Sequence, residues 1–240
     1  EPPADLLAKY QRKLQALDDS KIDPEYLASV EALDRNVGRI MADLEKRGIA
    51  KNTTVLFTSD NGGIPSRISP LKGSKGSLYE GGLKVPAAVW GYGVKASGQA
   101  CEEVVVGMDF YPTLVELAGL SHEPSHRPDG MSLVPLFRGE KSLERESLFW
   151  HFPCYIGKGS PSSVIRKGNL KLIHFFEDKR SELYDLVRDP NETNDLSKSK
   201  VREKELLEME LFAWWKETGA ALTSGPNPSF DPTAVSKRKG

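Results

Sequence analysis

The stretch Thr53-Thr-Val-Leu-Phe-Thr-Ser-Asp60-Asn61-Gly62-Gly63 decides how the rest of the chain is interpreted. It is a short, apolar, β-branched run that stops on an acid, an amide and two glycines. A buried strand that ends at a functional edge has this pattern, and ligands of open α/β sheets collect beyond the carboxyl ends of strands. A carboxylate beside an amide oxygen suits Ca²⁺ or Mg²⁺. The ordinary alternative is a strand ending in a turn, because Asp, Asn and Gly also favour turns.

The segments around this strand predict an α/β fold. Residues 1–17 carry a short helical pattern, and a longer amphipathic helix is predicted from the N-cap Asp23 and Pro24 to Gly48. A helix that leads into a continuous apolar strand is half of a parallel α/β unit. Further strands are predicted over 84–91 and 102–106, and a helix over 108–119. We therefore expect a partial parallel-type sheet with helices.

The pattern changes after about residue 140. Four short runs, 147–152, 163–166, 170–176 and 182–186, read as strands, with a tight turn at Lys167-Gly168-Asn169. A helix is predicted over 200–218. The expected organisation is a core domain over 1–140, an antiparallel sheet plus helix forming an α+β subdomain over 141–222, and a Pro-, Ser-, Gly- and Lys-rich tail over 223–240.

Composition excludes several classes of function. The 240 residues include 33 Lys and Arg against 34 Asp and Glu, and no basic block indicates a nucleic-acid partner. No apolar run approaches the roughly 20 residues that span a bilayer. The two cysteines, Cys101 and Cys154, form no CxxC pair, so a zinc–thiolate site is not expected. A single disulfide bridge between them is still an alternative.

Lys75 is the second candidate site residue, in the long loop over 64–79. Glycines and serines flank it, so an anion can approach its ammonium closely. The run lacks the first glycine of a phosphate-binding P-loop. A glycine-flanked lysine is otherwise an ordinary solvated loop residue. Beside Asp60 and Asn61, however, a lysine and a divalent cation would together suit a sulfate or phosphate group.

These motifs resemble those of the formylglycine-dependent sulfatases of the alkaline phosphatase superfamily. The resemblance rests on Phe57-Thr-Ser-Asp-Asn-Gly-Gly63, on Lys75-Gly-Ser-Leu-Tyr-Glu-Gly-Gly82 and on the following Val85-Pro86. Similar runs continue, in family order, over 108–119, 128–139, 165–173 and 183–194. The likeness covers roughly residues 5–217, and it implies an alkaline-phosphatase-like fold with a small C-terminal antiparallel sheet and helix.

The resemblance implies roles for individual residues. Asp60 and Asn61 would be two of the Ca²⁺ ligands, and Lys75 would contact the sulfate and the leaving-group oxygen. The family's nucleophile arises in a Cys/Ser-x-Pro-x-Arg motif, which this chain does not contain. The family's upstream aspartate pair and catalytic histidine also have no counterpart here. We therefore expect the C-terminal half of a sulfatase for sulfated carbohydrates or aryl sulfates, without turnover by itself.

Two further residues are weaker candidates for substrate contact. His151, in Phe149-Trp-His-Phe152, is either a substrate contact or a half-buried strand residue, and Arg166 is either a substrate contact or a surface charge on the hairpin. Phosphate-ester hydrolysis within the superfamily, or a non-catalytic binding module, are the alternative functions. A truncated parallel sheet leaves an edge uncovered, which predicts a homo-oligomer or a partner supplying the missing N-terminal half. The expected location is periplasmic or secreted.

Overall fold

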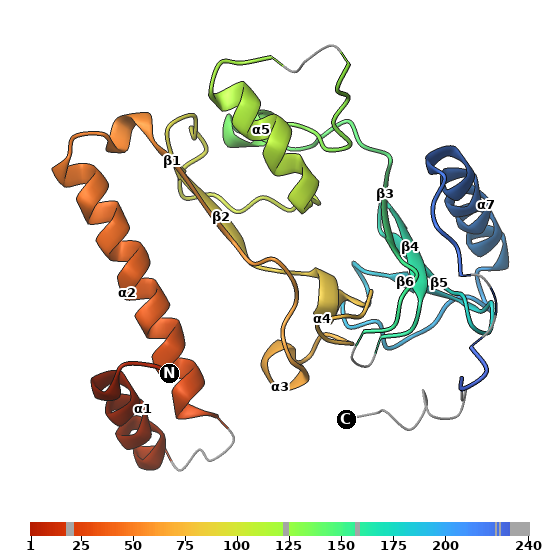
Figure 1. Cartoon of the computed structure of the whole chain (residues 1–240), viewed down its shortest axis with the longest axis horizontal. Coiled ribbons are helices and arrows are strands. Elements are labelled where there is room, and N and C mark those ends of the chain that lie inside the picture. The colour runs from red at the N-terminus through yellow and green to blue at the C-terminus, as the bar shows by residue number, and fades with distance from the viewer. Residues whose placement is uncertain (18–21, 122–124, 157–158, 224, 226, 231–240) are drawn as a thin grey trace.

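The computed structural model describes residues 1–17, 22–121, 125–156, 159–223, 225 and 227–230. Most of the tail predicted over 223–240 therefore lies outside the described residues. Figure 1 shows two N-terminal helices at one end of the molecule and a four-stranded sheet with a helix at the other. A short strand pair and two single-turn helices lie between them. No helix within the described ranges has the length and apolarity needed to cross a membrane.

The N-terminal helices are α1 (Ala4–Ala16) and α2 (Pro24–Lys46). The predicted cap of α2 is confirmed: the Asp23 carboxylate accepts a hydrogen bond of 2.9 Å from the Glu25 amide, and Pro24 opens the helix. Lys9 pairs with Glu31 across the two helices at 2.6 Å. The helices bury one face against each other, at Leu6, Leu14 and Ala28.

Strands β1 (Thr54–Thr58) and β2 (Ala87–Gly91) form a two-stranded sheet. They pair antiparallel, with Leu56 opposite Val89, so the expected parallel arrangement is wrong for this pair. A parallel pair needs a crossover that returns the chain to the start of the first strand. The residues after β1 instead form a loop at its end, with the single-turn helices α3 (Pro65–Ile68) and α4 (Glu80–Leu83), so the chain enters β2 from that end.

The segment after β2 leads to the C-terminal sheet. The strand predicted over 102–106 is also wrong: this run is irregular, because Val105 packs into an apolar cluster with Leu133 and Phe137 instead of joining a sheet. The 3₁₀ helix η2 (Gly107–Asp109) and α5 (Phe110–Leu117) together confirm the predicted helix, and α6 (Val134–Phe137) follows. A further 3₁₀ turn, η1 (Ala50–Asn52), precedes β1.

The C-terminal part confirms the predicted antiparallel sheet and helix. Strands β3 (Ser147–Phe152), β4 (Ser162–Lys167), β5 (Leu170–Phe175) and β6 (Ser181–Asp185) are hydrogen-bonded in chain order, and α7 (Val201–Thr218) covers one face. On that face Ile165 and Leu172 pack with Leu211. The opposite face packs against Leu78 and Tyr79. The sheet is therefore held between α7 and the loop that carries the candidate lysine.

Candidate functional site

Asp60 and Asn61 follow β1 directly, as the sequence predicts. Asp60 is exposed and Asn61 is half-buried. The Ser59 hydroxyl donates to the Asn61 carbonyl at 3.0 Å, which fixes the backbone of this turn. Within the described part of the chain, no hydrogen bond or ion pair engages the Asp60 carboxylate. This carboxylate is therefore available to an external ligand.

The two glycines after Asn61 allow the backbone of the Lys75 loop to come very close. The Gly62 amide donates to the Gly82 carbonyl at 3.0 Å, and a Cβ added at Gly62 would lie 2.0 Å from the Gly81 oxygen. The Lys75 amide donates to the Gly63 carbonyl at 2.8 Å. Only glycine permits this approach at position 62. These backbone hydrogen bonds close the fourteen residues between Asp60 and Lys75 into a loop whose two ends lie together.

Lys75 is presented on a tight, internally bonded turn. The Ser77 hydroxyl accepts from the Ser74 amide at 3.1 Å and donates to the Ser74 carbonyl at 2.9 Å. Gly76 has a φ of +88°, which favours glycine. The Lys75 side chain is exposed, and no carboxylate of the described residues pairs with it. Its ammonium therefore carries a positive charge that none of the described carboxylates neutralises, on a loop whose backbone meets the turn after β1.

The site borders a segment that the sequence did not single out. A Cβ added at Gly76 would lie 2.7 Å from the Ile156 methyl carbon Cγ2, and one added at Gly159 would lie 2.0 Å from the Gly76 oxygen. The connection between β3 and β4 therefore lies directly against the Lys75 turn. It carries the exposed Tyr155, whose hydroxyl donates to the Glu177 carboxylate. In the sequence, the glycines of the run Gly157-Lys-Gly159 are the signal that could have indicated a close contact here.

The oxygen donors fit a hard cation but do not complete its coordination. Ca²⁺ takes six to eight oxygen ligands, and Asp60 and Asn61 offer two side chains. Across the described residues, no group of three or more His, Cys, Asp or Glu side chains could hold a metal ion. Among the described residues, Asp60 and Asn61 would therefore supply only some of the ligands that such a cation needs.

His151 lies on the α7 face of the C-terminal sheet. Its Nδ1 is 2.5 Å from the Ser163 hydroxyl and its Nε2 is 2.8 Å from the Ala221 carbonyl. Its ring meets those of Trp214 and Trp215. The loop that carries Lys75 packs against the opposite face of the sheet, so the structure does not bring His151 to the Asp60–Lys75 site.

Arg166 lies on the other face of the same sheet, with Lys171 as its register partner. It is half-buried, and its Nε is buried without a hydrogen-bond partner among the described groups. No described interaction joins it to Lys75. Arg166 is thus only partly exposed and lies on the face opposite α7, and its role as a substrate contact or a hairpin charge stays a prediction.

A second histidine on the α7 face predicts a pH dependence of stability. His174 is 8% exposed, its Nδ1 is 2.9 Å from the Ser181 hydroxyl, and burial lowers its pKa. In the unfolded chain the His174 imidazole takes up a proton near pH 6.5, whereas in the folded chain it does so only at lower pH. The free energy of unfolding therefore falls as pH drops below about 6.5. Urea unfolding between pH 5 and 7.5 should show this loss, and His174→Gln should reduce it. The exposed His126→Gln is the matched control; an equal reduction in both variants would contradict the assignment to His174.

Comparisons with known proteins agree with the motif order. The chain matches the Sulfatase family model over residues 2–120, and the model of the C-terminal part of N-sulphoglucosamine sulphohydrolase over residues 74–213. A sulfatase of Formosa agariphila is 39% identical over 216 residues, which cover 81% of this chain and 39% of the relative. An N-acetylglucosamine-6-O-sulfatase of Bacteroides thetaiotaomicron is 31% identical over 195 residues, covering 77% of this chain and 34% of the relative.

Solved structures share the fold. The structure of Ps i-CgsB in complex with k-i-k-neocarrahexaose superposes with a TM-score of 0.76 at 25% identity, covering 95% of this chain and 49% of that chain. The chain therefore spans between a third and a half of the length of these relatives. Because the family models match on both sides of Lys75 and the superposition extends over nearly the whole chain, the protein belongs to the sulfatase family and has its alkaline-phosphatase-like α/β fold.

Proposed function

We propose that this chain is the C-terminal portion of a formylglycine-dependent sulfatase and carries part of the site for Ca²⁺ and for the sulfate ester. The observation that carries the proposal is the hydrogen bond from the Lys75 amide to the Gly63 carbonyl at 2.8 Å. It holds the backbone of Lys75 against the turn that follows Asp60 and Asn61, and among the described residues neither the Lys75 ammonium nor the Asp60 carboxylate has an ionic partner. Sulfuryl transfer needs positive charge at the sulfate oxygens, as phosphoryl transfer does.

Each residue would have a distinct part in the reaction. The Asp60 carboxylate and the Asn61 amide oxygen would hold Ca²⁺, which as a Lewis acid supplies positive charge to the sulfate oxygens. The Lys75 ammonium would donate hydrogen bonds to a sulfate oxygen and to the oxygen of the departing alcohol. Negative charge grows on that oxygen as the S–O bond breaks, so this contact strengthens toward the transition state.

The proposed substrate is a sulfated carbohydrate, with aryl sulfates as simple surrogates. Two relatives support this class by name: one is an N-acetylglucosamine-6-O-sulfatase, and one structure holds neocarrahexaose. In this chain, the exposed Tyr155 and Ile156 border the Lys75 turn. An aromatic ring and an aliphatic side chain beside an anion site could contact the apolar face of a sugar.

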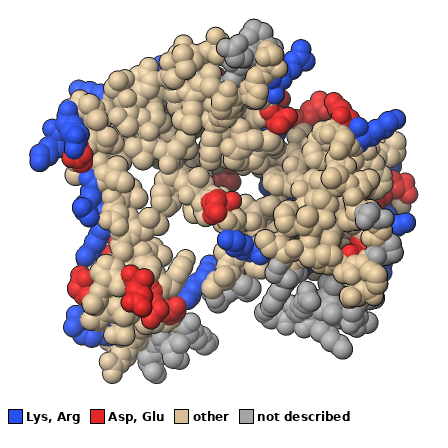
Figure 2. Space-filling model, viewed as in Figure 1, with Lys and Arg blue, Asp and Glu red and all other residues tan. Residues whose placement is uncertain are grey.

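The chain also presents apolar surface that a partner would cover. On α2, Val30, Leu33 and Ile40 are 46%, 50% and 58% exposed. A groove of about 1240 Å³ runs along β2 and is lined by residues such as Val89 and Phe137. Figure 2 shows an opening between the α2 side and the C-terminal part. We propose that the remainder of a sulfatase fold, or a second copy of the chain, covers these surfaces. We also propose a periplasmic or secreted location.

A chimera tests the proposed function. This chain would replace the 216 matched residues of the Formosa agariphila sulfatase, and the protein would be made in a host that generates formylglycine. We expect calcium-dependent hydrolysis of an aryl sulfate by the chimera and none by the 240-residue chain alone. Hydrolysis of phosphate monoesters without sulfate esters would instead favour a phosphatase. Tight Ca²⁺ binding by the chain alone, measured by calorimetry, would favour an independent binding module.

A further inference from the structure

A buried ion cluster joins the C-terminal sheet to the loop that carries Lys75. The Lys171 ammonium, on β5, lies 2.8 Å from Glu80 Oε1 and 2.9 Å from Glu192 Oε1. The lysine side chain is 1% exposed, Glu192 is fully buried, and Glu80 is 11% exposed. Glu80 opens α4, five residues after Lys75 and directly before the glycines that meet Gly62. The cluster therefore bridges two parts that are 91 residues apart in the chain.

The cluster is built for placement more than for stability. Glu192 Oε2 also accepts a hydrogen bond of 2.6 Å from the Glu80 amide, so the second carboxylate holds the backbone of the first. Burial raises the pKa of Glu192, against the lowering influence of Lys171. Buried ion pairs lose much of their Coulomb energy to desolvation, and apolar replacements are often at least as stable. The geometry nonetheless requires Lys171 to lie between the two carboxylates, although Glu192 Oε1 accepts no hydrogen bond among the described groups.

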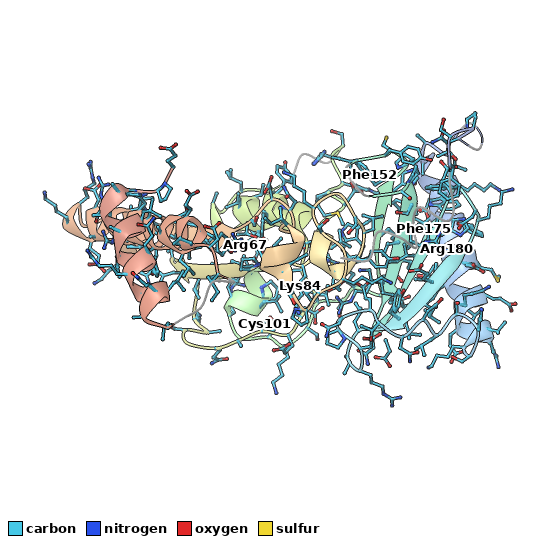
Figure 3. The ribbon with its side chains drawn as sticks, turned by 90° about the horizontal axis from the view of Figure 1, so that it is seen from below. Arg67, Lys84, Cys101, Phe152, Phe175 and Arg180 are labelled. Carbon is cyan, nitrogen blue, oxygen red and sulfur yellow. The ribbon has the colours of Figure 1, made fainter. Side chains whose placement is uncertain are left out.

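A second set of contacts joins the same sheet to Lys72, which precedes Lys75 in the loop. The Lys72 ammonium donates to the Tyr184 hydroxyl at 2.8 Å and lies 4.2 Å from the centre of the Tyr79 ring. Both tyrosine hydroxyls donate to Glu182, at 2.6 and 2.7 Å. Figure 3 shows Phe175 and Arg180 on this sheet, with Arg67 of α3 farther toward the helical end.

We propose that Lys171 is a positioning residue: through its ion pairs with Glu80 and Glu192, the C-terminal sheet holds the Lys75 turn against the Asp60–Asn61 turn. The functional meaning of this placement rests on the proposed sulfatase role of Lys75. The position of the Lys75 turn is a property of the backbone, and hydrogen exchange of the Lys75 amide measures whether this turn stays in place. This amide bonds to Gly63 and has no contact with Lys171.

Amide hydrogen exchange of the complete 240-residue chain tests the proposal and requires neither Ca²⁺ nor substrate. In Lys171→Met, we expect the Lys75 and Gly81 amides to exchange about tenfold faster or more, because the loop opens locally. Amides of α7 should keep their rates. Glu80→Gln should produce the same pattern. The double variant should add little to either single change, because each single change already breaks the Lys171–Glu80 ion pair.

Lys167→Met is the matched control, since this lysine is on the neighbouring strand and pairs at the surface with Glu210 at 2.8 Å. It should leave the exchange of the Lys75 amide unchanged. If Lys171→Met does not fold, Glu80→Gln alone decides, because it leaves the Lys171–Glu192 pair in place. Unchanged loop exchange, or equal acceleration in the loop and α7, would overturn the proposal. The two proposals can fail separately. If the chimera hydrolyses no sulfate ester but Lys171→Met still accelerates exchange only in the Lys75 loop, the positioning role holds and the sulfatase role is contradicted.

Discussion

Asp109→Ala is expected to lower the free energy of unfolding by about 3–5 kcal/mol, the cost of breaking a buried ion pair. Asp109 is fully buried and accepts hydrogen bonds of 2.9 Å from the Val106 and Met131 amides. It also pairs with both terminal nitrogens of Arg145, whose side chain is only 10% exposed. Alanine would leave a buried guanidinium and two amides without their acceptor.

Urea unfolding followed by tryptophan fluorescence measures this loss. Arg138→Ala is the matched control, because it breaks a surface pair with Glu116 at 3.7 Å between side chains that are 56% and 41% exposed. Exposed pairs contribute about 0–1 kcal/mol. A loss below about 1 kcal/mol for Asp109→Ala would mean that water reaches Arg145 once the carboxylate is removed, and would contradict its structural role.

Lys75→Met in the chimera is expected to lower kcat/KM for an aryl sulfate by about 10²–10³-fold. Removing one hydrogen-bond donor to a developing negative charge has an effect of this size in other enzymes. Methionine keeps the length of the side chain and removes the charge. Most of the loss should fall on kcat, because the contact with the departing oxygen strengthens only as its charge develops. The effect should shrink for substrates with more acidic leaving groups, which need less stabilisation.

Lys51→Met is the control for a general effect of removing positive charge, since Lys51 is exposed in η1, before β1. It should leave both kinetic constants near those of the unaltered chimera. Equal losses in the two variants would point to long-range steering of the anionic substrate, which salt would suppress. A Lys75 effect confined to KM, and independent of the leaving group, would show that this lysine binds the ground state only.

Local sequence signals predicted most elements well. The N-cap Asp23 and Pro24 placed the start of α2, and the Lys167-Gly168-Asn169 turn placed the β4–β5 hairpin. These signals depend on neighbours along the chain, so the sequence contains them directly. The failures were the direction of the β1–β2 pair and the strand over 102–106. Both depend on which distant segment offers a hydrogen-bonding or apolar partner.

The candidate site shows the same division. The motifs named Asp60, Asn61 and Lys75, because acid–amide–glycine and glycine-flanked lysine patterns are local. They did not reveal that His151 faces α7 with both ring nitrogens paired. Nor did they reveal Lys171, because one lysine in the run Leu170–Phe175 looks like an ordinary solvent-facing strand residue. Its burial follows only from the carboxylates that meet it.

The sequence by itself thus determined the family, the secondary-structure elements of the C-terminal sheet and the residues offered for metal and anion binding. Tertiary structure alone decided that the Lys75 amide reaches Gly63 and that Lys171 meets Glu80 and Glu192. The physical reason is separation along the chain. A cap or a turn is fixed by groups a few residues apart, whereas a buried charge is stable only where folding brings its partners from far away.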